Sequence, residues 1–190
     1  MADLLFIRHG ESIWNAAGRW QGQADPPLSE VGRRQADALA DGLRGESLAL
    51  LAASDLVRAA ETARMVGEAL GLTPRLVPEL RELDVGIWSG LRHAEIEARF
   101  PDELARFRAG DLEVRPGGGE SRAEFRRRVC GALDRLFADA PGGVAVVSHL
   151  GVLRAVRPAA VLRNAAWVRL SRDELTAHAG GYHGDVDTRL

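Results

Sequence analysis

Two short stretches, RHGES at residues 8–12 and SHLG at residues 148–151, each place a histidine directly after a run of apolar residues. Arg8 precedes the first of these histidines, His9, and the second is His149. A third apolar run, LLAAS, is followed by a predicted helix with Arg58 near its start. Arginine keeps its charge at neutral pH, and its fork of N–H donors fits phosphate oxygens. These residue types predict a phosphate site, provided that the fold brings them together.

Such a site could do more than bind phosphate. Positive charge on neighbouring arginines disfavours the protonated form of a histidine, so the imidazole would stay neutral. A neutral imidazole can attack phosphorus and form a phosphohistidine. The leaving oxygen then needs a proton donor, and a carboxyl group on a loop could supply it. The stretch ELRELD offers Glu79, Glu82 and Asp84, and spacing alone does not choose among them.

The apolar runs at residues 4–7, 48–54 and 144–148 are typical of strands that are buried on both faces. Helical patterns separate them, and this alternation predicts an α/β fold with a mostly parallel central sheet. Ligands of such sheets bind in the crevice at the carboxyl ends of the strands. His9 and His149 are both expected at that edge.

The first predicted helix begins after Ser29, a plausible N-cap, and ends at Gly45. Val31, Leu39 and Leu43 are expected on its buried face. The remaining expected elements are a helix over 55–71 ended by Gly71, a short strand near 75–77, one or two helices over 93–110 broken at Pro101, a helix over 121–139 with a capping box of Ser121 and Glu124, and a last strand over 165–170.

Composition narrows the function classes. The chain has 190 residues, 46% hydrophobic and 27% charged, with a formal net charge of -2, so nucleic acid is not an expected partner. All 25 basic residues are arginine, which excludes a lysine Schiff base or a P-loop lysine. Cys130 is alone and is expected to be a small buried side chain. Neither a secretory segment nor a membrane span is expected, and a cytoplasmic protein follows.

Several motifs occur together in one order. They are RHGES with Asn15, QGQADPPLSEVGRRQA, SDLVRAAETA, LRELDVGIWSG, PGGGES and VVSHLG. In this order they resemble the histidine phosphatase superfamily, whose fold is similar to phosphoglycerate mutase. The resemblance covers roughly residues 4 to 170. It implies a three-layer αβα sandwich, with residues 1–190 as a single domain and a polar tail from about 176.

The resemblance also implies a role for each matching residue. His9 would be the phosphorylated nucleophile, and Arg8, Arg58 and His149 would hold the phosphoryl oxygens. Glu82 would be the general acid and then the base for water. Asn15, Gln21, Gly22 and Leu150 would lie near the phosphate or the substrate. No metal and no cofactor is expected, and the partner would be a small phosphorylated metabolite.

Three functions compete within this family: a phosphatase, a cofactor-dependent phosphoglycerate mutase and a silent phosphate-binding module. The short segment between Trp88 and Pro116 favours the phosphatase, because glycolytic mutases of the family carry an insertion there. The silent module would be expected to have lost His9 or Glu82, and both are present. The physiological substrate and the oligomeric state stay open, with a homodimer as one alternative.

Several of these residues also have a simpler structural explanation. Leu150 departs from the common pattern, which has glycine there, and its side chain could narrow the pocket floor. Arg58 could pair with Glu61 or Glu11 on a helix surface. The run Arg126–Arg128 is expected on the solvated face of its helix. In the tail, His178, His183 and Asp185 match no known metal-ligand spacing.

Overall fold

The computed structural model of this chain describes residues 4–140 and 142–171. The strands are β1 (Leu4–Arg8), β2 (Leu50–Ala53), β3 (Arg75–Leu76), β4 (Val144–Ser148) and β5 (Trp167–Leu170). The helices are α1 (Ile13–Ala16), α2 (Glu30–Gly42), α3 (Val57–Leu70), α4 (His93–Arg99), α5 (Pro101–Arg108), α6 (Arg122–Asp139) and α7 (Leu150–Val156), with 3-10 turns η1 (Pro78–Leu80), η2 (Gly86–Trp88) and η3 (Pro116–Gly118). The predicted tail from about 176, with His178, His183 and Asp185, lies outside the described residues.

The sheet has the order β3-β2-β4-β1-β5. The first four strands in this order run parallel, and β5 pairs antiparallel with β1. This confirms the predicted α/β fold with a mostly parallel sheet. In the β1–β4 register Arg8 lies opposite Ser148, so His9 and His149 follow at the same carboxyl-end edge.

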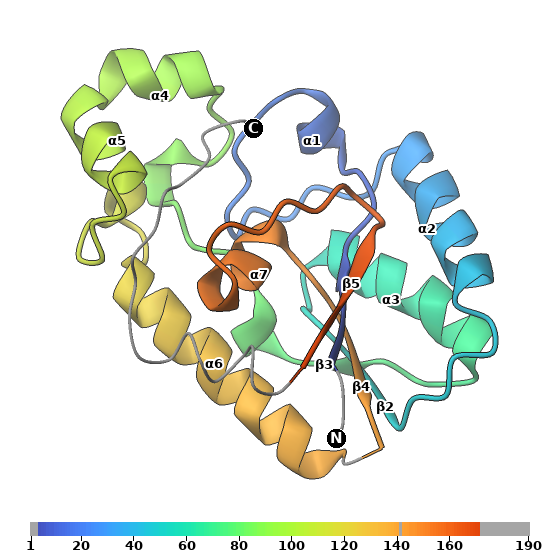
Figure 1. The fold of residues 1–190 in the computed structure, drawn as a ribbon. Helices are drawn as coiled ribbons and strands as arrows, with labels where there is room; N and C mark the ends of the chain where they lie inside the picture. The colour runs from blue at the N-terminus through green and yellow to red at the C-terminus, as the bar shows by residue number, and fades with distance from the viewer. Residues whose placement is uncertain (1–3, 141, 172–190) are drawn as a thin grey trace.

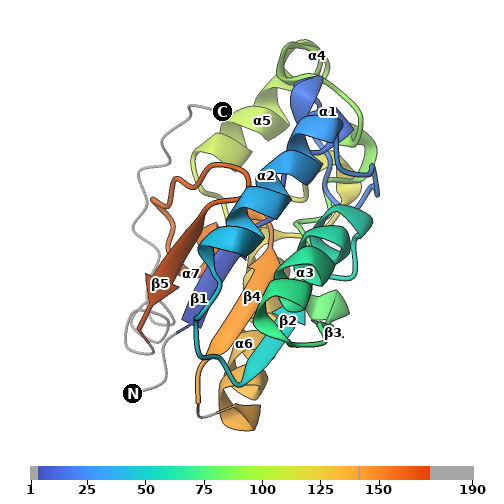
Figure 2. The same ribbon diagram turned by 90° about the vertical axis from the view of Figure 1, so that its right-hand side faces the viewer.

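Helices cover both faces of the sheet and give the predicted three layers. The helices α2 and α3 lie on one face, and α6 and α7 lie on the other (Figures 1 and 2). Successive residues of β1 serve different layers, because side chains alternate along a strand. Leu5 and Ile7 belong to the core beneath α2 and α3, whereas Leu4 and Phe6 belong to the core beneath α6 and α7. The continuous apolar run therefore buries β1 on both sides.

Three helix ends agree with their sequence signals, but the predicted end at Gly45 is wrong, because α2 ends at Gly42 and Leu43 is its C-cap. Ser29 caps α2 by accepting a hydrogen bond from the backbone N–H of Gly32 at 2.9 Å. Gly71 ends α3 in the left-handed conformation, with φ of 69°. Ser121 and Glu124 form the predicted capping box at the start of α6. Ser29 and Ser121 fix where α2 and α6 begin, whereas Gly71 fixes where α3 ends before β3.

The prediction for Val31 is wrong, because its side chain is 43% exposed. Leu39 and Leu43 are buried as predicted. The buried face of α2 continues backwards through Ala36 to Gly32, at the four-residue spacing of one helix face, and Val31 falls outside it. Gly32 packs so closely on the preceding loop that no larger side chain fits there.

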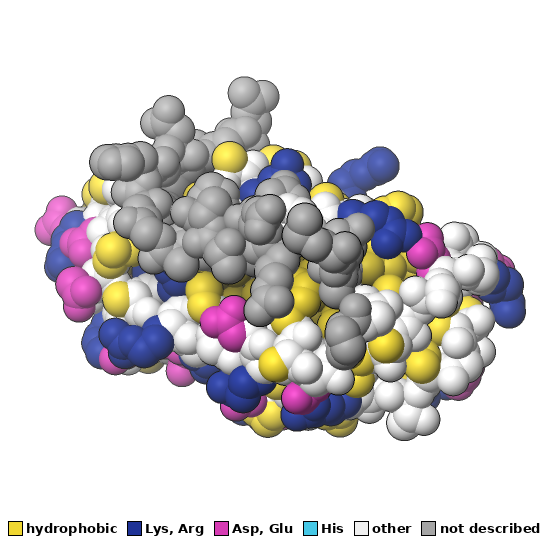
Figure 3. Space-filling view, turned by 60° about the horizontal axis from the view of Figure 1, so that its bottom comes forward, with side chains coloured by type: hydrophobic (Ala, Val, Ile, Leu, Met, Phe, Trp, Pro, Cys, Tyr) yellow, Lys and Arg dark blue, Asp and Glu magenta, His cyan; other side chains and the backbone are white. Residues whose placement is uncertain are grey.

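The surface carries mixed charge. On the face shown in Figure 3, arginine and acidic side chains lie scattered among hydrophobic ones. Within residues 4–140 and 142–171, no helix is both long enough and apolar enough to cross a membrane.

The helices α1, α4 and α5 lie beyond the carboxyl ends of the parallel strands (Figures 1 and 2).

Candidate active site

The two histidines at the sheet edge lie against each other. The ring centroids of His9 and His149 are 5.1 Å apart, with an angle of 61° between the rings. Their side chains are 3% and 0% exposed, respectively. Both positions follow from one cause, since each histidine comes directly after a strand of the parallel pair β1–β4.

Hydrogen bonds define the tautomer of His9. Its Nδ1 lies 2.6 Å from the carbonyl oxygen of Gly10, and a ring nitrogen can approach a carbonyl in this way only as a donor. The Nε–H of Arg58 points at Nε2 of His9, over 3.3 Å. We therefore assign the proton to Nδ1 and the lone pair to Nε2. The lone pair on Nε2 of His9 thus points toward the guanidinium of Arg58. A cation at this place could hold an anionic substrate next to the nitrogen that attacks it.

Burial and positive charge keep both rings neutral. Burial is the largest cause that lowers the pKa of His9 well below 6.5, and the charge of Arg58 adds to it. The pKa of His149 is also lowered well below 6.5, first by burial and then by the charge of Arg58, with smaller effects from His9, Arg8 and Arg128. At neutral pH both imidazoles are thus uncharged.

Arg58 is a buried cation whose side chain is fixed by backbone carbonyls. It is 1% exposed, and it donates to the oxygens of Gly22 at 3.0 Å and Ala24 at 2.9 Å. Burial lowers the pKa of Arg58 to about 10, while the negative charge of Glu82 opposes the shift. The guanidinium therefore remains charged at neutral pH, beside His9.

The alternative surface pairing of Arg58 is wrong. Glu61 instead forms an ion pair with Arg33, at 2.8 Å. Glu11 accepts a hydrogen bond from the hydroxyl of Ser29, at 2.7 Å. Arg58 instead donates to the backbone carbonyls of Gly22 and Ala24.

Two polar atoms of the site are buried and have no hydrogen-bond partner among the described residues: Nε of Arg8 and Nδ1 of His149. Other atoms of the same side chains are bound, since Nη1 of Arg8 donates to the carbonyl of Leu162 at 2.7 Å and Nε2 of His149 lies 2.9 Å from Oγ of Ser54. Buried polar groups are rarely left unpaired without a functional reason. Both atoms fit the oxygens of an anion.

The carboxylate of Glu82 is held by two backbone N–H groups. Leu83 donates to Oε1 at 2.9 Å, and Gly151, near the start of α7, donates to Oε2 at 3.1 Å. The charge of Glu82 also acts on Arg8 and Arg58, where it opposes the lowering of the pKa that burial causes. The carboxylate therefore lies beside the two cations of the site.

The other two candidate carboxylates point elsewhere. Glu79 is 45% exposed and forms an ion pair with Arg135, at 2.8 Å. Asp84 accepts a hydrogen bond from the N–H of Gly86, at 2.9 Å, within its own loop. Of the three, only Glu82 contacts the segment that follows His149.

At the start of α7, the residue that packs most closely against Glu82 is Gly151 and not Leu150. A Cβ atom at Gly151 would lie 1.9 Å from Oε1 of Glu82. Leu150, where glycine is common in the resembling family, is the first residue of α7 and is half-buried. The glycine that the carboxylate requires is therefore present.

Asn15 and Gln21 belong to the polar contacts around His9. Oδ1 of Asn15 accepts from the N–H of Ser12 at 3.1 Å and from Nδ2 of Asn164 at 3.3 Å. The same Nδ2 donates to the carbonyl of His9 at 3.1 Å. Oε1 of Gln21 accepts from the hydroxyl of Ser12 at 2.7 Å. Asn15 lies in the one-turn helix α1, which is capped by Ser12 and was not predicted.

Gly22 contributes through its backbone. Its φ is +52°, and a Cβ atom there would lie 2.7 Å from Cγ2 of Val85. This close approach lets the carbonyl of Gly22 reach Arg58. Only glycine fits both the conformation and the space.

Three further polar residues support the site and were not predicted: Ser54, Thr62 and Asn164. Thr62 lies one turn after Arg58 on α3, where its hydroxyl accepts from the N–H of Gly10 at 3.1 Å and donates to the carbonyl of Arg58 at 2.8 Å. Ser54 follows β2 directly, as His9 and His149 follow their strands. This common position was a signal for Ser54, whereas no local pattern pointed to Asn164.

The prediction that Arg126–Arg128 forms a solvated face is wrong for Arg128. Its side chain is only 20% exposed and donates to backbone carbonyls of the segment that carries Glu82. Arg128 also forms an ion pair with Glu120, at 2.7 Å.

An open hollow of about 460 Å³ lies beside Arg8. Its lining consists of Arg8, Gln35, Arg163, Asn164, Ala165 and Ala166. Neither histidine lines the hollow, which is connected to His9 through Asn164, the donor to the backbone carbonyl of His9. Its volume suits a small molecule.

Comparison with known proteins places these features in a family. A family model described as the histidine phosphatase superfamily (branch 1) matches residues 4–178. The chain is 37% identical over 189 residues to a glucosyl-3-phosphoglycerate phosphatase of Mycobacterium tuberculosis, covering 88% of this chain and 84% of that protein. It is 40% identical over 162 residues to a metal-independent phosphoserine phosphatase of Arabidopsis thaliana, covering 82% and 67%.

A third relative carries a different activity in its name. The chain is 38% identical over 154 residues to a probable phosphoglycerate mutase of Yersinia pestis, covering 78% of this chain and 70% of that protein. Among solved structures, a mycobacterial glucosyl-3-phosphoglycerate phosphatase in complex with VO3 superimposes with a TM-score of 0.82 at 35% identity, covering 92% and 94%.

Proposed function

Because this chain belongs to the histidine phosphatase superfamily (branch 1), we propose that it hydrolyses the phosphomonoester of a small metabolite through a phosphohistidine on His9. The observation that carries the proposal is the state of His9. Its ring is buried and neutral, with Nδ1 bound to the carbonyl of Gly10 and Nε2 beside Arg58. The names of two relatives as phosphatases support the same reaction type.

In the first step, the lone pair on Nε2 of His9 attacks phosphorus. A P–N bond forms while the P–O bond to the leaving group breaks. Glu82 gives a proton to the departing oxygen, so the leaving group departs as an alcohol and Glu82 is left as the carboxylate. Arg8, Arg58 and His149 donate to the phosphoryl oxygens, where negative charge is concentrated during the transfer.

In the second step, water attacks the phosphohistidine. Glu82 takes a proton from the water, a P–O bond forms, and the P–N bond breaks. Inorganic phosphate leaves, His9 is again neutral, and Glu82 is again protonated. The hydrogen bonds from Leu83 and Gly151 support this role because they hold the carboxylate in one place for both steps.

The chain's own cations supply the charge that this mechanism needs, and we propose that no metal takes part. Arg8 and Arg58 lie beside His9, and the relative from Arabidopsis thaliana is named metal-independent. Asn15 and Gln21 would orient the phosphate, and Gly22 would act through Arg58. Leu150 would contact the substrate from the start of α7. We place the activity in the cytoplasm, because charged phosphate esters do not cross an apolar bilayer.

Mutase activity is the second candidate function, and one relative supports it by name. A mutase must exclude water from the phosphoenzyme and hold a second phosphate. Between Trp88 and Pro116 the chain has the short helices α4 and α5, and this leaves little material for such a cover. A silent binding module is disfavoured, because every residue that the mechanism requires is present.

A panel of phosphorylated metabolites tests the proposed function. Phosphate release is measured in a chelator, with glucosyl-3-phosphoglycerate, phosphoserine, sugar phosphates and nucleotides as substrates. We expect hydrolysis of at least one small ester, at a rate that exceeds any mutase turnover stimulated by 2,3-bisphosphoglycerate. Faster mutase turnover would reverse the ranking. No turnover on any ester, together with no phosphoenzyme, would contradict the proposal.

The variant Gly151→Ala is expected to lower kcat on alkyl phosphates by about 10- to 100-fold, because the new Cβ displaces the carboxylate of Glu82. The matched control is Gly42→Ala on α2, where a Cβ meets no atom within 4 Å. The control should keep full activity and gain about 0.5–1 kcal/mol in the free energy of unfolding. Steady-state kinetics and denaturant unfolding check both. Full activity in Gly151→Ala would show that Glu82 need not occupy its observed position.

A further inference from the structure

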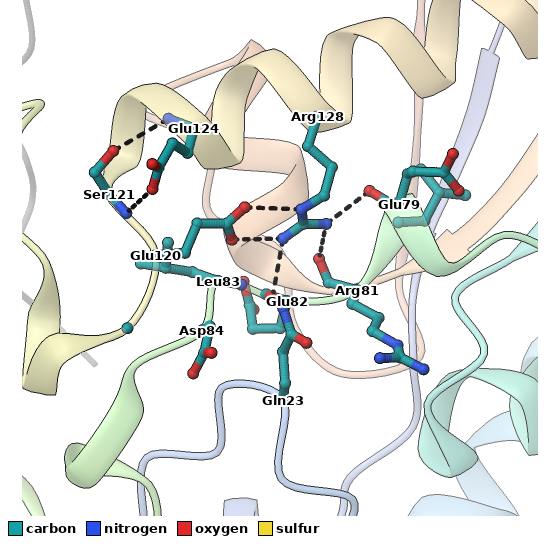
Figure 4. A network of polar contacts seen from close by, with 12 residues as sticks. Gln23, Glu79, Arg81, Glu82, Leu83, Asp84, Glu120, Ser121, Glu124 and Arg128 are labelled. Atoms are coloured by element: carbon teal, nitrogen blue, oxygen red, sulfur yellow. Dashed lines mark hydrogen bonds and ion pairs between the residues drawn. The ribbon is translucent and has the colours of Figure 1, made fainter.

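The guanidinium of Arg128, on α6, binds three backbone carbonyls of the segment that carries Glu82. Its Nη1 donates to the oxygen of Glu79 at 2.7 Å and to that of Arg81 at 3.0 Å, and its Nη2 donates to that of Glu82 at 3.3 Å (Figure 4). We call residues 79–84 the acid loop. In sequence, 46 to 49 residues separate Arg128 from these carbonyls.

The remaining donors of Arg128 bind Glu120. Nε donates to Oε1 at 2.9 Å, and Nη2 donates to Oε2 at 2.7 Å. A guanidinium has five N–H donors, and here each has an acceptor. Glu120 is itself tied to the acid loop, since its backbone N–H donates to the carbonyl of Asp84 at 3.0 Å. The guanidinium also lies over the ring of Phe125, 5.0 Å from its centroid.

These contacts hold the backbone of the acid loop at both ends of Glu82. Between η1 and η2 the loop has no regular structure that could fix it. Arg128 holds the carbonyl side of the loop against α6, and the N–H groups of Leu83 and Gly151 hold the carboxylate. A shift of the backbone would therefore move the carboxylate relative to His9.

We propose that Arg128, held by Glu120, is a positioning residue that fixes Glu82 for proton transfer by binding the backbone of the acid loop. This inference rests on the proposed function, in which Glu82 is the general acid. None of the five donors of Arg128 is directed at His9. Its charge also lowers the pKa of His149, and a lysine at position 128 keeps that charge. A misplacement of about 1 Å at a reacting group can cost on the order of 100-fold in rate.

The leaving group separates positioning from general damage to the site. An alkyl phosphate releases a strongly basic alkoxide, so its cleavage depends on proton donation by Glu82. p-Nitrophenyl phosphate releases a weakly basic phenolate that needs no proton. The ratio kcat/KM reports the steps up to release of the leaving group. A shifted acid loop should therefore lower kcat/KM for the alkyl ester far more than for the nitrophenyl ester.

The test compares Arg128→Lys with the control Arg135→Lys. Lysine keeps the charge but lacks the planar fork of five donors. Arg135 lies on the same helix, and its one ion-pair partner among the described residues is Glu79, at 2.8 Å, with 59% of the Arg135 side chain exposed. The alkyl ester is the one that the wild-type chain hydrolyses fastest among phosphoserine, 3-phosphoglycerate and glucose 6-phosphate.

For Arg128→Lys we expect kcat/KM to fall about 10- to 100-fold on the alkyl ester and less than about threefold on p-nitrophenyl phosphate. Arg135→Lys should match the wild type on both. Equal losses on the two esters, or no loss on either, would overturn the proposal. If Arg128→Lys does not fold, Glu120→Gln loosens the same guanidinium, and the same unequal pattern is expected with smaller losses.

Amide hydrogen exchange gives a readout that needs no turnover. In Arg128→Lys the N–H groups of Leu83 and Gly151 should exchange faster, by about tenfold, because their acceptor Glu82 is no longer fixed. Unchanged exchange would overturn the positioning role. If the wild type hydrolysed neither ester, the proposed function would fail, and exchange would still decide whether Arg128 holds the acid loop.

Discussion

Replacing His9 by alanine is expected to lower kcat for phosphomonoester hydrolysis by about four orders of magnitude or more, as is usual when a nucleophile is removed. The remaining groups can still bind phosphate, but no atom near phosphorus keeps the free lone pair that Nε2 supplies. The same change removes the acceptor of the Nε–H of Arg58, and the free energy of unfolding should fall by about 1–3 kcal/mol. Steady-state kinetics and denaturant unfolding measure the two effects.

A chemical rescue separates loss of the nucleophile from loss of the fold. In His9→Gly the side-chain site is vacated, and added imidazole should restore part of the activity in proportion to its concentration. Far-UV circular dichroism of both variants should match the wild type. If His9→Ala kept more than about 1% of wild-type kcat on a folded protein, another group would be the nucleophile.

Replacing Arg58 by glutamine is expected to lower kcat/KM by about 100- to 1,000-fold, because the change removes a buried cation that, in the proposed mechanism, donates to the phosphoryl oxygens. The change also moves the pH profile. After burial, the charge of Arg58 is the strongest influence that lowers the pKa of His9. Without that charge the pKa rises, so the imidazole becomes protonated at a higher pH. Activity should therefore decline, on acidification, at a higher pH than in the wild type.

The matched control for this variant is Arg64→Gln, on the same helix α3. Arg64 is 61% exposed and, within the part of the chain that the structure describes, forms an ion pair with Glu68 alone. Its replacement should leave both the rate and the pH profile unchanged, since exposed pairs of this kind contribute little. Measuring kcat/KM from about pH 4.5 to 8 decides the matter. If kcat/KM of Arg58→Gln declined at the same acidic pH as that of the wild type, the electrostatic explanation for the low pKa of His9 would be contradicted.

The geometry of the histidine pair could be predicted from the sequence because it depends on strands. A buried apolar run before His9 and another before His149 indicate parallel strands, and such strands end at one edge. The structure confirms this arrangement of the sheet. Buried strands leave a strong local signal, since four or five apolar residues in succession suit few other structures.

The role of Arg128 could not be predicted, because its partners are distant in the sequence. On α6 it is one of three adjacent arginines, and such a run is usually solvated. Its acceptors are backbone carbonyls, which every residue has and which no sequence pattern distinguishes. The requirement for Gly151 was hidden for the same reason. Only the structure shows that the acid loop approaches α7 and that Glu82 occupies the space that a Cβ atom of Gly151 would need.

The prediction for Val31 failed for a different reason. Three apolar residues of α2 suggested one stripe, but the helix makes its closest contact through Gly32, which has no side chain to mark it. A glycine on a buried face allows two backbones to approach, and patterns of hydrophobicity do not register this. The error is local and leaves the position of the site unchanged.

The measurement that tests the central claim most directly is detection of the phosphoenzyme. The wild-type chain is mixed with the ester that it hydrolyses fastest, in the presence of a chelator, and quenched in alkali, where phosphohistidine survives. Peptide mass spectrometry should then find one phosphoryl group per chain, on His9, and acid should remove it. Turnover without any such adduct, or an adduct on a residue other than His9, would contradict the mechanism.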